Sequence, residues 1–580
     1  MRAPAARAMR RSTVTAAVRA FRRVTVTAAM RTFQRVTVTA ILLWVLAPFT
    51  PCRAQALMDG QSLTPSVIAH IAEGEAVQVS PAALKRVEGA HRVLLEAARN
   101  GQPIYGLTVG VGLNKDRTMV SMSGTLTPQQ MTASRRFNVN LIRAHSSGIG
   151  PDMDERTARA AMAVRLNNLL TGGAGVQPAI IDAYVQFLNR DITPAMPSGG
   201  SIGEADITIL SHVGLSMLGE GDVYFRGKKM PAADALREAG LQPIQPYGKD
   251  ALGIFSSNAY SSGMAALALH DLEGLSRVSK LVYALSLEAL DGNVSPFLQD
   301  TLALRPFPHT VHAGQELRAL LEGSSLWRRS DRRPLQDPLS FRDGVYLLGE
   351  QDRAIAECRS LLNIQLNSSD DNPGVALDVL PPSTLDQARR GYVAADGITG
   401  AVLPSANFEP LPWVLAFEEL GLAIAHNSLA SAQRIIHLND EHLTGLSRFL
   451  GTDQAVHAFG ATEKLPVALA EENRELALPV SMDYLPVAGG IEDIATNAPR
   501  VVERVQRQID NSYALLGIEL VQAAQAIDLR KKSQSGFTLS AETAVLYDAL
   551  RREVSFLDVD RSMTGDYRKA ANVLRSQTPR

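Results

Sequence analysis

Residues 500–530 read RVVERVQRQIDNSYALLGIELVQAAQAIDLR. Apolar side chains recur in this stretch at spacings of three and four residues: Val502, Val505, Ile509, Tyr513, Leu516 and Leu520. Those spacings place all of them on one stripe of an α-helix. Because such a stripe must be covered along its whole length, the stretch predicts a long helix packed within a bundle of other helices.

The same helical periodicity runs through most of the chain after residue 57. It covers four further stretches, 154–190, 259–291, 411–436 and 541–557. Patterns typical of β-strands are scarce and short, as around 221–226. Loops rich in Gly, Pro and Ser lie between the helices, at 103–114, 145–151, 171–176, 196–203 and 367–374. We therefore predict a mainly α protein, a long-helix bundle with a loop-rich N-terminal region that carries the chemistry.

We divide the chain into a leader, an N-terminal active-site region, a central helical bundle and a helical tail. The boundaries are 1–56, 57–250, 251–540 and 541–580, and no linker separates independent domains. The composition is globular, with 46% hydrophobic and 20% charged residues. Two cysteines exclude a disulfide scaffold and a thiolate zinc cluster. An aromatic content of 5% argues against stacking-based nucleic-acid binding.

The leader differs from the rest of the chain in charge. Residues 1–56 hold ten arginines and no acidic residue, although the whole chain has a net charge of −1. Without the leader, 48 basic residues stand against 59 acidic ones, a net charge of −11. A body this acidic is not expected to bind the phosphate backbone of a nucleic acid.

The leader also carries the features of a secretory signal. Three copies of a 12-residue unit fill 12–47, and the last runs into the apolar ILLWVLAPF and the small-x-small site Ala54-Gln55-Ala56. The apolar run is too short to span a bilayer comfortably. We predict a cleaved signal, with an uncleaved anchor as the alternative, and a start for translation at Met1 or Met30. The mature protein would begin near Leu57, periplasmic or secreted, with no stable membrane span.

A series of short motifs runs in order from about residue 62 to about 550. It comprises Tyr105-Gly106 with Gly110-Val111-Gly112, Asn140 to His145, Gly200-Ser201-Ile202-Gly203, Gln336-Asp337 with Arg342, Asp371-Asn372-Pro373, Ser405-Ala406-Asn407-Phe408, Glu472-Asn473 and Glu492-Asp493. The series resembles the aromatic amino-acid ammonia-lyase family, which includes histidine and phenylalanine ammonia-lyases. The resemblance implies a mainly helical fold of the ammonia-lyase and fumarase-like type. It also implies a homotetramer whose active sites draw residues from three subunits.

The segment that matches the family's cofactor position departs from the family pattern. Family members form an electrophile, methylidene-imidazolone, from Ala-Ser-Gly: the serine loses water, and the flexible glycine lets its nitrogen attack a carbonyl. Here the segment reads Gly203-Glu204-Ala205-Asp206, and Asp206 cannot dehydrate to an alkene. Ser256 replaces the asparagine that supports the cofactor, and Leu339 replaces a tyrosine. We therefore expect no methylidene-imidazolone.

The resemblance assigns roles to other residues. Tyr105 matches the catalytic tyrosine, which could act as a general base if nearby positive potential lowers its pKa. Arg342 matches the arginine that holds the substrate carboxylate with its two-pronged guanidinium. The other matched site residues are Glu472 among the catalytic groups and His145, Ser256, Gln336, Asn407 and Phe408 on the substrate side. His145 and Glu472 stand where histidine-specific members place polar groups, which favours a polar ring, although each could instead be structural.

Two carboxylates have no counterpart in the family. Glu204 and Asp206 fall where several helix N-termini of the family fold create a positive pocket. They are either acid–base groups, with an ionised Asp206 that moves a proton or holds the amino group, or anions that fill a vacated positive site. A metal site with His145, Glu472 or His212 is a third interpretation, but no short ligand spacing supports it and no metal is expected.

Three functions remain open at this point. The first is an exported lyase that acts on an amino acid or related carboxylate without the electrophile, by eliminating a better leaving group than ammonium, by using a more acidic β-proton, or by the reverse addition. The second is a non-catalytic small-molecule binding homologue. The third is a conventional histidine-type ammonia-lyase with another route to its cofactor. The retained Tyr105, Arg342 and Glu472 favour an enzyme with a small-molecule substrate.

Overall fold

The computed structural model describes residues 55–124, 127–381, 388–395 and 397–577. These residues belong to one compact unit, Gln55–Arg580. The predicted leader lies outside the described residues except for Gln55 and Ala56. The unit is mainly helical, as predicted. Within the described ranges, no helix combines the length and apolar character needed to cross a bilayer.

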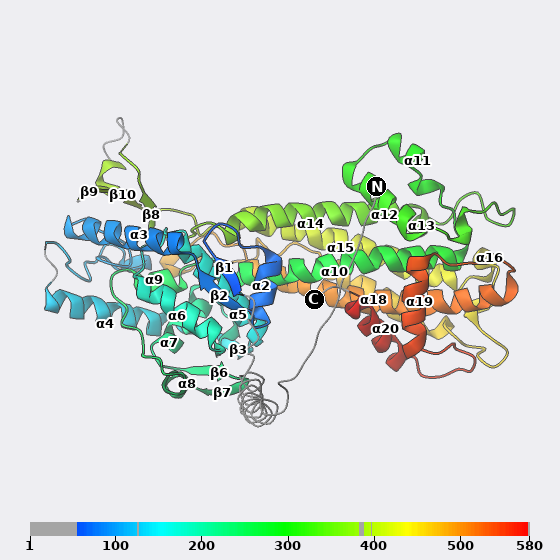
Figure 1. Ribbon diagram of the computed structural model, residues 1–580, viewed down its shortest axis with the longest axis horizontal. Helices are drawn as coiled ribbons and strands as arrows, with labels where there is room; N and C mark the ends of the chain where they lie inside the picture. The colour runs from blue at the N-terminus through cyan, green and yellow to red at the C-terminus, as the bar shows by residue number, and fades with distance from the viewer. Residues whose placement is uncertain (1–54, 125–126, 382–387, 396, 578–580) are drawn as a thin grey trace, which may run out of the picture. The chain divides into compact units, whose positions relative to one another are not determined.

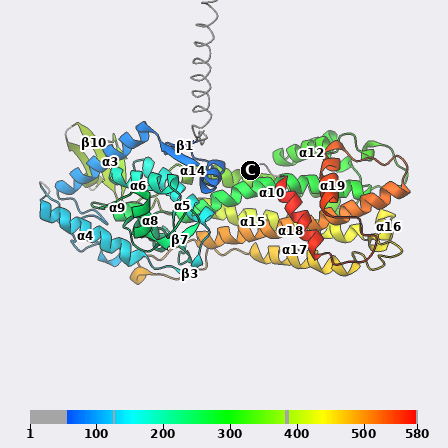
Figure 2. The same cartoon turned by 60° about the horizontal axis from the view of Figure 1, so that its bottom comes forward.

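Four long helices run side by side and form the bundle (Figures 1 and 2). They are α10 (Ala259–Leu290), α14 (Gly344–Leu366), α15 (Leu411–Leu438) and α18 (Ala498–Ser533). The helix α18 contains the whole stretch 500–530, and α10 and α15 match the predicted 259–291 and 411–436 closely. Periodicity located α10, α15 and α18 well because each has a continuous apolar stripe, whereas α14 is not among the predicted stretches.

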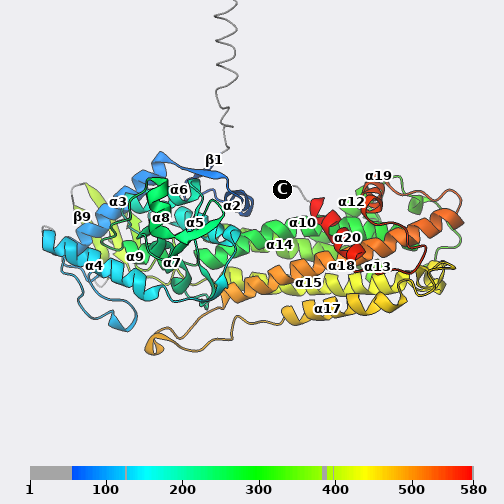
Figure 3. The ribbon, with the colours of Figure 1, turned by 90° about the horizontal axis from the view of Figure 1, so that it is seen from below.

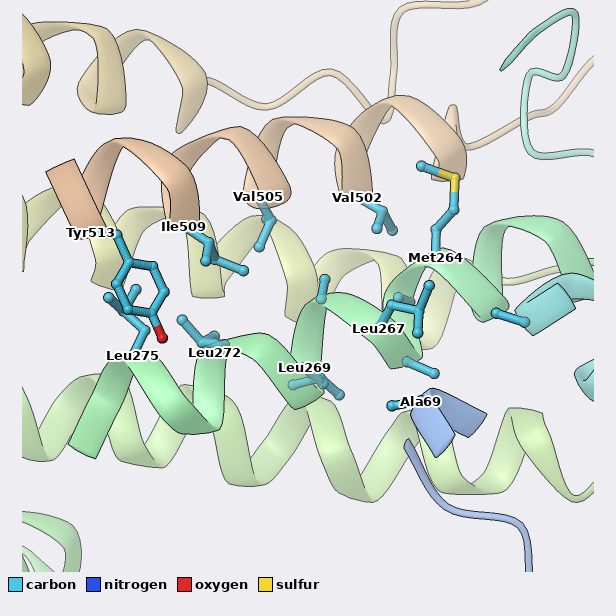
Figure 4. Close-up of a cluster of buried hydrophobic side chains, with 14 of the residues drawn as sticks. Ala69, Met264, Leu267, Leu269, Leu272, Leu275, Val502, Val505, Ile509 and Tyr513 are labelled. Carbon is cyan, nitrogen blue, oxygen red and sulfur yellow. The ribbon is translucent and has the colours of Figure 1, made fainter. Parts of the chain in front are cut away.

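The apolar stripe of α18 packs against α10 in the centre of the bundle (Figure 4). Val502 and Val505 of α18 are almost fully buried, and so are Leu267 and Leu272 of α10. Each aliphatic side chain buried in this way contributes about 1.5–3 kcal/mol of hydrophobic stabilisation. The contact explains why the quoted stretch decides the fold.

Shorter helices make up the N-terminal region. They are α2 (Pro65–Ala72), α3 (Pro81–Arg99), α4 (Pro128–His145), α5 (Glu155–Leu170), α6 (Pro178–Asn189), α7 (Ile207–Met217), α8 (Ala232–Ala239) and α9 (Asp250–Phe255). The predicted helical stretch 154–190 is two helices, because Gly172 and Gly175 adopt positive φ angles of 90° and 70° and break it. Since α10 packs on both α5 and α18, the boundary drawn at residue 250 crosses a continuous core.

Four small sheets accompany these helices. β1 (Gln55–Met58) pairs in parallel with β2 (Ala76–Val79), and β3 (Ile149–Asp152) pairs antiparallel with β5 (Pro197–Gly199). The order β4–β6–β7 joins Ile192–Pro194, Asp222–Phe225 and Lys228–Pro231. The order β8–β10–β9 joins Gly374–Leu377, Ile398–Leu403 and Tyr392–Ala395. β6 corresponds to the one strand expected from the sequence, around 221–226.

The remaining helices complete the far part of the bundle. They are α11 (Gln299–Ala303), α12 (Pro308–Leu320), α13 (Leu339–Arg342), α16 (Glu441–Thr444), α17 (Lys464–Leu476), α19 (Ala541–Glu553) and α20 (Thr564–Ser576). Figure 3 shows α17 alongside α15 and α18, and the loop after it running back toward α4. The tail helix α20 packs on α18, so the predicted tail belongs to the same core.

Candidate active site

Asp206 lies between β5 and α7, and its side chain is fully buried at the start of α10. Its Oδ1 accepts a hydrogen bond from Ser201 Oγ at 2.5 Å. Its Oδ2 accepts two from Ser261, from the backbone N at 2.9 Å and from Oγ at 2.7 Å. Ser261 is in the first turn of α10, so the carboxylate meets the positive end of that helix.

Both carboxylate oxygens of Asp206 are therefore engaged. Burial raises the pKa of Asp206 to about 6, while the bonds from Ser201 and Ser261 act against that shift. The group is still mostly ionised at neutral pH. Its position corresponds to the interpretation of an anion that fills a helix N-terminus. The side chain of Asp206 is fully buried in the single chain, and its contact with substrate stays a prediction.

Glu204, two residues earlier, is one of two carboxylates, with Glu492, whose charges raise the pKa of Tyr105. It is half-buried, and burial followed by repulsion from Glu492, Glu409 and Asp493 raises the pKa of Glu204 to about 7. We call these four residues the acidic cluster. Glu204 has no Lys or Arg ion-pair partner within the described part of the chain.

Tyr105 lies in the 103–114 loop, which a glycine allows to fold tightly. Gly106 has a φ of 72°, and a Cβ there would lie 2.4 Å from Leu252 Cδ2. The Tyr105 hydroxyl oxygen accepts a hydrogen bond from Gly112 N at 2.8 Å. Burial raises the pKa of Tyr105, and Glu492 and Glu204 raise it further. The positive potential expected around this phenol is absent from its described surroundings, because its charged neighbours there are carboxylates.

His145 ends α4 and lies near the acidic cluster. Its Nδ1 donates to Leu141 O at 2.8 Å, so the tautomer that fits this bond leaves Nε2 free to accept. The ring stacks on Phe255, with centroids 4.8 Å apart and an interplanar angle of 22°. The proximity of His145 lowers the pKa of Glu492, although burial of Glu492 outweighs this effect and its pKa is raised. The two stacked rings form a flat aromatic surface, and Nε2 of His145 is available on it as a hydrogen-bond acceptor.

The 405–408 loop reaches the same region. Phe408 is partly buried, and its carbonyl oxygen accepts a hydrogen bond from Asn258 Nδ2. Asn407 is exposed, and Ser256 is nearly buried at the end of α9. The structure thus brings six predicted residues to one region in space, where the loops meet α7, α9 and the start of α10. They are Tyr105, His145, Asp206, Ser256, Asn407 and Phe408.

Gln336 and Arg342 lie elsewhere. They line a cavity of about 320 Å³ together with Asp337, Asn293 and Tyr346. This cavity adjoins α13, at the end of the bundle opposite to α7 and α9 (Figures 1 and 3). Arg342 forms no direct ion pair among the described residues, although its charge acts to lower the pKa of Asp337 in the same cavity.

Glu472 belongs to a third location. It lies near the end of α17 and forms an ion pair with Arg507 of α18. The predicted residues therefore fall into three groups within one chain.

The sequence alone does not reveal the acidic cluster as a unit. Glu492 and Asp493 stand out only as part of a motif, and nothing in the sequence singles out Glu409. The available signal was the loop 477–497, whose glycines at 489 and 490 let the chain return to the Tyr105 loop. A larger cavity of about 540 Å³, lined by His70, Arg156 and His270 among others, contains none of the predicted residues. In the described ranges, no group of three or more His, Cys, Asp or Glu side chains is placed to hold a metal ion.

Comparison with known proteins identifies the class to which this fold and site belong. A sequence model of the aromatic amino acid lyase family matches residues 63–552, so the chain belongs to that family. It is a lyase that resembles histidine ammonia-lyase. The histidine ammonia-lyase of Chloroflexus aurantiacus is 32% identical over 515 residues, which cover 87% of this chain and 93% of that protein.

Solved structures agree with this assignment. The ergothioneine-degrading enzyme ergothionase from Treponema denticola, in complex with desmethyl-ergothioneine sulfonic acid, is 34% identical, with a TM-score of 0.80. The match covers 90% of this chain and 99% of that one. The histidine ammonia-lyase of Trypanosoma cruzi is 25% identical, with a TM-score of 0.77 and coverages of 90% and 94%. The predicted ammonia-lyase fold is thereby confirmed.

Proposed function

We propose that this chain is an exported, homotetrameric lyase that eliminates a tertiary amine from the quaternary ammonium group of an imidazole-type amino-acid betaine, without methylidene-imidazolone. The observation that carries the proposal is the acidic cluster beside Tyr105, at the position where the family's Ala-Ser-Gly reads Glu204-Ala205-Asp206. A site with excess negative charge suits a substrate with a permanent positive charge.

Residues 204–206 do not fit the family's electrophile. Its formation needs a serine that can dehydrate and a following glycine nitrogen that can attack, and neither is present. The buried Asp206 carboxylate holds the loop through Ser201 and Ser261 instead. The negative charge of the acidic cluster would also repel the electron density that builds up on the electrophile when it reacts with a substrate. We therefore derive the reaction from this chain's own residues.

We favour ergothioneine as the substrate, because the match to the structure of ergothionase extends over 90% of this chain. Its α-nitrogen carries three methyl groups and a fixed positive charge, and its ring is a thio-substituted imidazole. A trimethylammonium group leaves as a neutral amine, which is an easier departure than that of an amino group in equilibrium with its free base. Such a substrate reduces the need for an electrophile.

In the proposed step, the Tyr105 phenolate removes the proton from Cβ. The C–H electron pair forms the Cα–Cβ double bond, and the Cα–N pair leaves with trimethylamine. In the unliganded protein the Tyr105 phenol is protonated at neutral pH, as any ordinary tyrosine is, and burial, followed by the charges of Glu492 and Glu204, raises its pKa further. The substrate's positive charge would offset the repulsion from these two carboxylates, and so bring the phenol closer to ionisation. Glu204 has a pKa of about 7, and its ionised carboxylate holds the substrate cation.

The remaining contacts are proposed to come from the assembled tetramer. His145 and Phe255 offer a stacking wall for the ring. Arg342 of another subunit would bind the substrate carboxylate, and its lack of an ion pair among the described residues supports that role. An exposed stripe on α15 supports assembly: Leu411, Leu415, Leu422 and Leu429 are 40–55% exposed at helical spacing. A stripe of this kind favours contact with a second copy.

A turnover assay tests the function. Purified tetramer should release trimethylamine from ergothioneine, and it should release ammonia from histidine at rates many orders of magnitude lower, because each 1.36 kcal/mol of lost stabilisation is tenfold in rate. Robust urocanate formation would support a conventional ammonia-lyase instead. Binding of ergothioneine with no turnover would support the non-catalytic alternative. Light scattering that reports a monomer at micromolar concentration would contradict the shared site.

Export is proposed with one revision to the cleavage site. Gln55 and Ala56 pair with Ala76 and Val77 in β1 and β2, so cleavage after Ala56 would remove half of β1. Cleavage after Ala54 keeps the strand intact, with Cys52 and Ala54 as the small residues of the site. N-terminal sequencing of native protein should give Gln55. An intact leader in cytosolic protein would contradict export.

A further inference from the structure

The backbone of Ala205 is clamped from both sides. Its N–H donates to Asn258 Oδ1 at 3.1 Å, and its carbonyl oxygen accepts from Ser257 N at 3.2 Å. Ala205 and Asp206 have φ angles of 56° and 33°, a left-handed region that residues with a Cβ disfavour. A conformation of this kind persists only where its surroundings enforce it.

Asn258 occupies an unusual position for such a clamp. It is the N-cap residue of α10, where asparagine normally accepts a hydrogen bond from the helix's own first turn. Its side chain makes no such bond. The first turn is capped by Asp206 instead, through Ser261 N. The Asn258 amide is thereby released for Ala205 and for Phe408 O, to which its Nδ2 donates.

We propose that Asn258 is a positioning residue that sets the place of the Glu204 carboxylate relative to Tyr105 and ties the 203–206 segment to the 405–408 loop. One amide joins both segments: its oxygen fixes the residue after Glu204, and its nitrogen fixes the carbonyl of Phe408. The clamp has the role that a covalent ring at this segment would otherwise have, because it makes the segment rigid at the point where Glu204 projects.

Buried charges hold Asn258 itself in place. Its backbone N donates to Asp370 Oδ2 at 2.8 Å, and Ser257 Oγ donates to the same oxygen at 2.8 Å. Asp370 Oδ1 in turn accepts from Arg165 Nη1 at 3.0 Å, and both of these side chains are almost fully buried. Asn258 is also fully buried. The 203–206 segment is therefore connected, through Asn258, to the buried ion pair of Arg165 and Asp370.

The inference rests on the proposed function for the role of Glu204, but the clamp can be tested without turnover. Asn258→Ala removes both bonds of the amide. Asn138→Ala is the matched control, because Asn138 is equally buried, accepts from Ala251 N through Oδ1 and donates through Nδ2 to Ser134 O and Gly248 O, away from residues 203–206. Asn258→Asp keeps the acceptor for Ala205 N and provides a second variant if Asn258→Ala does not fold.

Hydrogen exchange of the full tetramer, followed by mass spectrometry, reads the clamp directly. Asn258→Ala should raise exchange by at least about tenfold in peptides covering 203–207 and 405–409, and Asn138→Ala should leave these peptides unchanged. Asn258→Asp should raise exchange in 405–409 only. Exchange in 203–207 that is equal in Asn258→Ala and Asn138→Ala would overturn the proposal.

Kinetics with ergothioneine give the second readout. Asn258→Ala should lower kcat/KM about 10²-fold, the cost of a misplaced catalytic constellation, and should shift the midpoint near pH 7 that Glu204 contributes. Asn138→Ala should keep that midpoint even if it lowers the melting temperature equally. An unchanged pH profile in Asn258→Ala would overturn the positioning role. Absence of wild-type turnover would instead count against the proposed function, and the exchange result alone would then decide the clamp.

Discussion

Two regions of this molecule bury carboxylates in opposite ways. In the bundle, Glu519 is fully buried and its charge is fully matched. It accepts hydrogen bonds from Ser286 and Ser431 and from two nitrogens of Arg434, at 2.6 and 3.0 Å. Beside Tyr105, Glu204 faces three other carboxylates, and burial and their repulsion raise its pKa to about 7.

The difference indicates which region is built for a ligand. A fold that places an arginine against Glu519 can evidently match a buried acid when stability requires it. The acidic cluster keeps an unmatched negative charge, and unmatched charge in a partly buried site is typical of functional positions. A cationic substrate would neutralise the charge of the cluster, as Arg434 neutralises the charge of Glu519.

Tyr105→Phe should give the largest effect at the acidic cluster. Loss of the phenol should lower turnover about 10²- to 10⁴-fold, the range for a general base, and destabilise the fold by only about 1 kcal/mol through the lost bond from Gly112. Steady-state kinetics and urea unfolding measure the two. Full activity in Tyr105→Phe would move the base to another residue.

Glu519→Ala should give the largest effect in the bundle. It leaves Arg434, 5% exposed, without its counter-charge, which costs about 3–5 kcal/mol of folding free energy. Glu204→Ala, measured in the same urea titration, should show no comparable loss. Equal destabilisation by the two variants would break the distinction between matched and unmatched acids.

Asp206→Asn tests the assignment of this carboxylate to structure. An amide cannot accept all of the hydrogen bonds from Ser201 and Ser261, so stability should fall by about 1–3 kcal/mol. The displaced loop should raise KM and so lower turnover per folded tetramer, and the pH profile of kcat should stay the same. If stability is unchanged and one limb of the pH profile of kcat disappears, Asp206 moves a proton in the reaction.

Glu204→Gln should have the smallest effect on stability, and the sign of that effect depends on pH. A raised pKa means that the folded state binds more protons than the unfolded state between about pH 4.5 and 7. The contribution of Glu204 to stability is therefore complete below this window and is lost as pH rises through 7. Glu204→Gln should unfold at a higher temperature than wild type at pH 8 and should remove the decrease in KM between pH 6 and 8. A melting temperature lower than that of wild type at pH 8 would contradict the unmatched charge.

The sequence predicted the bundle better than the site. Long apolar stripes identified α10, α15 and α18, because helix packing is encoded within each stretch. The acidic cluster joins 204, 409 and 492–493, and no local pattern reveals that these positions meet. Asp206 was given a catalytic role because it occupies the position of a known chemical group. In the structure, Asp206 caps the first turn of α10 by accepting hydrogen bonds from Ser261, a contact across 55 residues of sequence that periodicity does not predict.

The intact mass of the purified protein tests most directly whether this lyase works without methylidene-imidazolone. We expect the mass of the unmodified mature sequence, with residues 203–206 recovered as an ordinary peptide after proteolysis, in a preparation that releases trimethylamine from ergothioneine. A mass lower by two water molecules, with the loss localised to this segment, would show that the electrophile forms and that the proposed mechanism is wrong.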